Sequence, residues 1–190
     1  MQFSGFSVIV SGLDFTILDW LHNHVIPHSV PVLQFISYTT TIVSISVALV
    51  LLITSIVKKS KTVLKQFLTL AAVLIIVLIV SQGLKALIIR ERPFVTHPYI
   101  EKLSEAGSSS FPSGHTLEAF AVAAALSLLF SRKKIVIPVY TWALLVAYSR
   151  MALGVHYPSD VLAGILIGSL IGWVVPSILN RFYSPRKITP

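Results

Sequence analysis

Three short segments of the chain place charged and imidazole side chains at the edges of strongly apolar runs. They are Lys85 to Pro93 (KALIIRERP), Pro112-Ser113-Gly114-His115, and a stretch that holds Ser149-Arg150, His156 and Asp160. Isolated charges are costly in such surroundings, so charges that persist there mark functional sites. Three cationic side chains, two histidines and one carboxylate can be drawn from these segments, and these are the groups that a phosphate-transfer site needs.

The first segment holds candidate anion ligands. Lys85 and Arg92 are seven residues apart, about two helical turns, and would point from one side of a helix that reached Arg92 and ended at Pro93. Lysine and arginine near helix ends often only extend to the membrane surface, and we interpret Arg90 in this way. Lys85 lies a turn deeper, so we interpret Lys85 and Arg92 as anion-binding residues.

The second segment reads as a loop that enters a helix. Ser113 is a predicted N-cap, and Gly114 allows backbone N–H groups to approach a phosphate at the helix start. An ordinary capped helix would look the same without His115, whose imidazole can protonate a leaving alkoxide at neutral pH. Glu118 follows one turn later and could hold His115, hold a site cation, or be the last solvated residue of the helix.

The third segment holds the candidate nucleophile. His156 and Asp160 are four residues apart with Pro158 between them, so the peptide turns and begins a helix near Ser159. Asp160 could then accept the Nδ1 proton of His156 and leave the Nε2 lone pair directed at phosphorus. Arg150 would supply a third cation. The alternative is an ordinary His–Asp pair at a helix start.

In their order and spacing, the three segments resemble the motifs of the type 2 phosphatidic acid phosphatase family. This family contains integral-membrane lipid phosphatases that are related in their core to vanadium haloperoxidases. The resemblance extends from Lys85 to Asp160, and no motif residue is lost. The alternatives from other functional classes are an inactive lipid-binding family member, which a lost motif residue would favour, and a lipid transporter, which would need charges along a path through several helices.

The resemblance implies a mechanism by double displacement. His156 attacks phosphorus and forms a phosphohistidine, while His115 protonates the leaving oxygen and then activates water. The phosphate oxygens are bound by Lys85, Arg92 and Arg150, with backbone N–H groups near Ser113 and Gly114. The implied substrates are phosphatidic acid, phosphatidylglycerophosphate, undecaprenyl diphosphate or a lipid A phosphate.

We expect no cofactor and no metal. The sequence offers no carboxylate cluster for a metal ion. The His-x-His-x-x-x-His string formed by His22, His24 and His28 has no acidic or cysteine partner nearby, so we do not interpret it as a metal site.

Composition places the chain in a membrane. The 190 residues suit a single domain, and 55% of them are apolar, 12% are charged, and the mean hydropathy is +0.84. A soluble domain has about 25% charged residues. The net charge of +8 is divided into clusters between apolar runs, which favours lipid headgroups as partners and argues against nucleic acid. The oligomeric state cannot be read from these features.

Five segments are long and apolar enough to span a bilayer. They are residues 33–57, 66–89, 115–130, 135–153 and 161–179. Residues 14–22 show a helical rather than uniform apolar pattern with Asp14, Asp19 and Trp20, which predicts an amphipathic helix on the membrane surface. The alternative is a sixth span from Phe3 to Leu21. The predicted fold is therefore an all-α membrane bundle of five or six spans with an interfacial N-terminal helix.

The charges also predict an orientation. With five spans, ten of the fifteen Lys and Arg residues fall on one side of the membrane, in the loops after residues 57 and 130 and in the C-terminal tail, while all seven acidic residues fall on the other. The positive-inside rule then places all three motifs outside the cytoplasm. We expect a multi-pass protein of the plasma (inner) membrane whose site faces the periplasm or exterior, with residues 103–111 as a flexible flap over its entrance.

Overall fold

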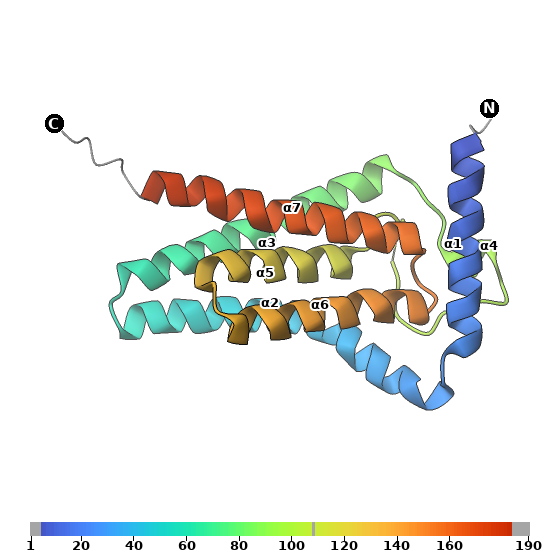
Figure 1. Ribbon diagram of the computed structural model, residues 1–190, viewed down its shortest axis with the longest axis horizontal. Coiled ribbons are helices and arrows are strands. Elements are labelled where there is room, and N and C mark those ends of the chain that lie inside the picture. Colours follow the sequence, from blue (N-terminus) through green and yellow to red (C-terminus); the bar gives the residue numbers. More distant parts are fainter. Residues whose placement is uncertain (1–4, 108, 184–190) are drawn as a thin grey trace.

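The computed structural model describes residues 5–107 and 109–183. All secondary-structure elements in these residues are helices, joined by loops (Figure 1). The helices are α1 (Gly5–His24), η1 (Pro27–Ser29), α2 (Val30–Val57), α3 (Lys61–Leu87), α4 (Pro93–Thr96), α5 (Gly114–Phe130), α6 (Lys133–Ala152) and α7 (Pro158–Tyr183). Four of these, α2, α3, α6 and α7, are long and apolar enough to cross a membrane, and α5 is a shorter apolar helix. The predicted five-helix bundle is confirmed.

Helix α5 forms the centre of the bundle because its residues are small. Every residue from Ala119 to Leu126 is buried, and α7 packs closely along it. A methyl group built on Gly168 or Gly172 of α7 would lie 2.2 Å from a backbone oxygen of α5, and one built on Gly164 would lie 2.9 Å from the carbonyl oxygen of Ser113, the N-cap of α5. The glycines at every fourth position of α7 therefore form its close-packing face.

The end of α3 differs from the prediction. The helix stops at Leu87, and Ile88 is already extended (φ −111°, ψ 92°), so Lys85 and Arg92 do not share a helical face. Arg92 is extended as well (φ −85°, ψ 157°), as expected for a residue before proline, and Pro93 begins α4 instead of ending α3. The extended segment between α3 and α4, residues 88–92, pairs with a later part of the chain, because Ser110 N donates to Arg90 O at 2.9 Å.

Helix α1 lies across the end of the bundle (Figure 1), in the arrangement expected for an interfacial helix. Leu13, Ile17 and Trp20 are 59%, 45% and 59% exposed, while Asp14 and Leu18 are buried against the bundle. Among the described residues, the helices that could cross a membrane do not include α1. The alternative sixth span would begin at Phe3, outside the described residues.

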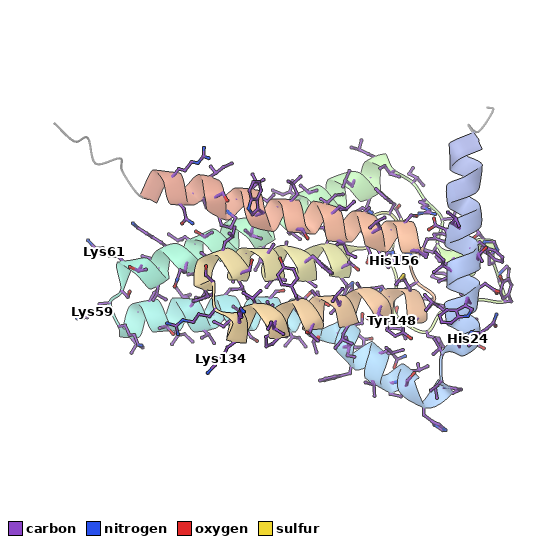
Figure 2. All side chains as sticks on the ribbon, in the orientation of Figure 1. His24, Lys59, Lys61, Lys134, Tyr148 and His156 are labelled. Carbon is purple, nitrogen blue, oxygen red and sulfur yellow. The ribbon has the colours of Figure 1, made fainter. Side chains whose placement is uncertain are left out.

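The basic loops and the motifs lie at opposite ends of the bundle. Figure 2 shows Lys59, Lys61 and Lys134 at one end and His156 near the other, beside α1. Arg186 and Lys187 of the predicted basic tail lie outside the described residues. Residues of all three motifs line one pocket with His156, so the motifs lie together at this end of the bundle, as one shared site requires.

Candidate active site

A pocket of about 510 Å³ opens between α2, α3 and α5 at the end of the bundle that carries the motifs. Its polar and charged lining includes Lys85, Arg92, His115, Glu118, Arg150 and His156, together with Thr41, Ser81, Gln82 and Glu105. Its apolar lining includes Ile45, Leu74, Val77 and Leu78. The pocket therefore joins a cationic end, suited to a phosphate, to an apolar wall, suited to a lipid tail.

Lys85 lies in the last turn of α3 and donates from Nζ to the Ser109 carbonyl at 2.9 Å. Arg150 lies in the last turn of α6, where it is almost fully buried, and it donates to the hydroxyls of Ser37 and Ser104. Among the described residues, no ion pair joins either cation to a carboxylate. Their charge therefore remains available to an anion in the pocket.

Arg92 reaches the same pocket from the linker before α4. Its guanidinium donates to the Val155 carbonyl at 2.7 Å and to the Ser109 carbonyl at 3.3 Å, and its Nε donates to the Gly107 carbonyl at 3.2 Å. Ser109 and Gly107 belong to the predicted flap, of which Ser108 is not described. Backbone carbonyls of this segment thus accept hydrogen bonds from Lys85 and Arg92.

His156 lies in the linker between α6 and α7 and is 2% exposed. Its Nε2 is 3.3 Å from Nη1 of Arg92. A guanidinium can only donate, so Nε2 accepts and the imidazole proton is assigned to Nδ1. The lone pair of His156 Nε2 is therefore directed toward the Arg92 guanidinium, which also lines the pocket.

Asp160 is completely buried behind His156. Its Oδ2 accepts hydrogen bonds from Ser110 Oγ at 2.5 Å and Tyr157 N at 3.0 Å. The distance from His156 Nδ1 to Oδ2 is 3.7 Å, so the two groups are at ion-pair distance but the predicted hydrogen bond is not formed. His156 Nδ1 is buried without a hydrogen-bond partner in the described part of the chain.

The surroundings of His156 favour a neutral imidazole. Burial lowers its pKa to about 4, and the nearby charges of Arg150 and Arg92 act in the same direction, while Asp160 opposes them. At neutral pH the ring is therefore unprotonated at one nitrogen, as a nucleophile must be.

Ser113, Gly114 and His115 begin α5, as predicted, with Ser113 at the N-cap position. The Ser113 N–H donates to the Asp160 carbonyl at 3.1 Å, and its hydroxyl bonds with Thr116 Oγ1 at 2.9 Å. This backbone hydrogen bond joins the second motif to the third. Gly114 and His115 do line the pocket.

Glu118 faces the pocket below His115. Its Oε2 accepts a hydrogen bond from Thr41 Oγ1 of α2 at 3.3 Å. Within the described residues Glu118 forms no ion pair with a site cation. Glu118 thus lies between the cationic and the apolar parts of the pocket lining.

The contacts of Arg90 contradict the interpretation that its side chain only extends to the membrane surface. Its guanidinium forms ion pairs with Asp160 at 2.5 Å and with Asp14 of α1 at 2.6 Å. Sequence reasoning missed this role because Asp14 is 76 residues away from Arg90. The available signals were an acidic residue within an apolar helix face and a second cation, beside Arg92, in the Arg-Glu-Arg triplet.

In residues 5–107 and 109–183, no group of three or more His, Cys, Asp and Glu side chains is placed to hold a metal ion. His24 of the histidine string stacks on Trp20 and its Nδ1 lies 2.7 Å from the Trp20 carbonyl.

Curated relatives share the part of the chain that carries the site. The chain is 39% identical over 83 residues to an undecaprenyl-diphosphatase BcrC of Bacillus subtilis, covering 44% of this chain and 42% of that protein. It is 37% identical over 91 residues to a lipid A 4'-phosphatase of Bacteroides thetaiotaomicron, covering 48% and 40% respectively. The matches thus span less than half the length of these relatives.

Solved structures share the fold. A transmembrane PAP2 type phosphatidylglycerolphosphate phosphatase from Bacillus subtilis superposes with a TM-score of 0.73 at 22% identity, covering 94% of this chain and 89% of that one. Aquifex aeolicus LpxE superposes with a TM-score of 0.69 at 27% identity, covering 87% and 95%.

Residues 66–184 match the PAP2 superfamily. This region is more than half of the chain and contains every residue of the three motifs, from Lys85 to Asp160. The chain therefore belongs to the PAP2 superfamily.

Proposed function

We propose that the protein is a metal-independent phosphatase that hydrolyses a phosphomonoester or diphosphate of a membrane lipid. The observation that supports this most strongly is the convergence of Lys85, Arg92 and Arg150 on a pocket that also holds His156. Three cations around one imidazole can neutralise the charge that a transferring phosphoryl group spreads over its equatorial oxygens.

The reaction proceeds in two displacements. His156 Nε2 attacks phosphorus as the P–O bond to the lipid breaks, and His115 gives a proton to the leaving oxygen. His115 then takes a proton from water, whose oxygen attacks phosphorus as the P–N bond breaks, and inorganic phosphate leaves. Asp160 orients His156 and stabilises its positive charge when the phosphohistidine forms.

The pocket also supports a lipid substrate. Ile45, Leu74, Val77 and Leu78 continue the lining away from the cations, so the phosphate can sit among charges while the first part of the tail contacts apolar side chains. The named relatives act on an undecaprenyl diphosphate and on lipid A. We include both among the candidate substrates, with phosphatidic acid and phosphatidylglycerophosphate.

The test is phosphate release from these four lipids by the purified protein in detergent, with the His156→Ala variant as control. We expect the wild-type protein to release phosphate from at least one lipid and the variant to release essentially none. A wild-type protein inactive on all four, or a variant as active as wild type, would contradict the proposal.

We further propose that the site opens to the periplasm or cell exterior. The basic loops at residues 58–61 and 132–134 lie at the opposite end of the bundle from the pocket, which supports this orientation by the positive-inside rule. The chain has no cysteine, so single exposed cysteines can report topology. Glu101→Cys should react with a membrane-impermeant thiol reagent in intact cells, and Lys58→Cys should not. The reverse pattern would overturn the orientation.

A further inference from the structure

A buried carboxylate fixes α1 to the catalytic end of the bundle. Asp14 is 4% exposed, and its Oδ1 accepts from Ser159 N at 2.8 Å. Its Oδ2 accepts from Ser159 Oγ at 2.5 Å and from Arg90 Nη2 at 2.6 Å. Leu18, one turn later on the same face, packs against Ile100 and Tyr157. The inner face of α1 thus combines a carboxylate with an apolar contact.

Arg90 connects this carboxylate to Asp160. Its Nη1 donates to Asp160 Oδ1 at 2.5 Å and to Ser159 Oγ at 2.7 Å, so one guanidinium bridges two buried carboxylates. The guanidinium also lies over the Tyr157 ring, 4.1 Å from its centroid. A charge-assisted pair of this kind fixes geometry as well as charge.

The same bridge sets the position of the carboxylate behind His156. Arg90 binds Oδ1 of Asp160, which leaves Oδ2 turned toward Ser110, Tyr157 N and His156 Nδ1. Removing the charged partner of Oδ1 would free the carboxylate to rotate and would leave a buried charge short of donors.

We propose that Asp14 and Arg90 are positioning residues for catalysis, acting through Ser159 and Asp160 on the orientation of His156. The interfacial helix is then part of the catalytic unit, although neither Asp14 nor Arg90 lines the 510 Å³ pocket. This inference rests on the proposed function, because it requires that His156 attacks and that Asp160 orients it.

The experiment compares Asp14→Asn with Asp19→Asn, the same charge change on the same helix at a residue that bonds neither Ser159 nor Arg90 in the described structure. The probes are undecaprenyl diphosphate and phosphatidic acid in detergent. Asp14→Asn should lower kcat at least about tenfold, about 1.4 kcal/mol of barrier, with KM within about twofold. Asp19→Asn should leave both constants near wild type.

A double-mutant cycle separates positioning from general folding. In an Asp160→Asn background, Asp14→Asn should change kcat by less than about twofold, because its route to His156 is already lost. A purely structural role would instead lower activity by the same factor in both backgrounds, and that additive result would overturn the inference. Equal kcat for Asp14→Asn and Asp19→Asn would overturn it as well.

Two further variants keep the outcomes distinct. If Asp14→Asn does not fold, Ser159→Ala takes its place, because it removes the hydroxyl that bonds Asp14 and Arg90. Ser159→Ala should then reproduce the fall in kcat at unchanged KM. A wild-type kcat from this variant would contradict the inference. Full activity of His156→Ala would overturn the proposed function itself. Normal Asp14→Asn kinetics beside an inactive His156→Ala would overturn only the role of α1.

Discussion

Adding one methyl group to Gly168 should destabilise the bundle at the contact between α5 and α7. A Cβ on Gly168 would lie 2.2 Å from the Leu117 carbonyl oxygen and 3.0 Å from its carbon, both backbone atoms of α5. Carbon and oxygen pack at about 3.3 Å or more, so α5 and α7 must separate by about 1 Å. Overpacking of this kind typically costs about 1–3 kcal/mol.

The matched control is Gly83→Ala on α3, where nothing lies within 4 Å of the added methyl group. Alanine is favoured over glycine in a helix by about 0.5–1 kcal/mol, so this variant should be as stable as wild type or more so. The measurement is the apparent Tm in one detergent, with an expected loss of about 2–10 °C for Gly168→Ala. A Gly168→Ala protein that melts with or above Gly83→Ala would refute the close packing of α5 on α7.

Three further predictions follow from the site. Arg92→Lys should lower kcat/KM at least about tenfold in phosphate-release assays, because an ammonium cannot replace a guanidinium that spans several acceptors; unchanged kinetics would argue against Arg92 as a phosphate ligand. Because the pKa of His156 is lowered to about 4 from 6.5, the unfolded chain binds more protons, so stability should fall as pH drops from 6.5 toward 4. His156→Gln should flatten this dependence of Tm on pH, and an identical profile would contradict the assignment. Activity should survive excess chelator; loss that Mg²⁺ restores would contradict a metal-independent mechanism.

The features that sequence predicted well are those set by short-range pattern. Long apolar runs gave the five bundle helices, since composition alone decides whether a segment can lie in lipid. The close contact of α7 with α5 also follows a short-range pattern, because the four-residue spacing of Gly164, Gly168 and Gly172 places them on one face. Lys85 and His156 stood out because their charge or imidazole lies beside apolar neighbours.

The features that sequence did not predict depend on tertiary contacts between distant residues. Arg90 was read as a surface residue because its partner Asp14 is reached only when α1 docks across the bundle end. Helix α3 ends at Leu87, and the extended segment after it is bonded through Arg90 O to Ser110 N, which is distant in the sequence. The hydrogen bond from the Ser113 N–H to the Asp160 carbonyl likewise joins two helices whose contact the local sequence does not show.

The role of His156 as the nucleophile is tested by looking for the covalent intermediate. The purified protein is mixed with a lipid phosphate labelled in its terminal phosphoryl group, quenched within milliseconds at alkaline pH, and digested for mass spectrometry. We expect an acid-labile phosphoryl group on His156 that disappears as phosphate is released, and none in His156→Ala. Steady phosphate release by His156→Ala at the wild-type rate, or label on another residue, would contradict the mechanism.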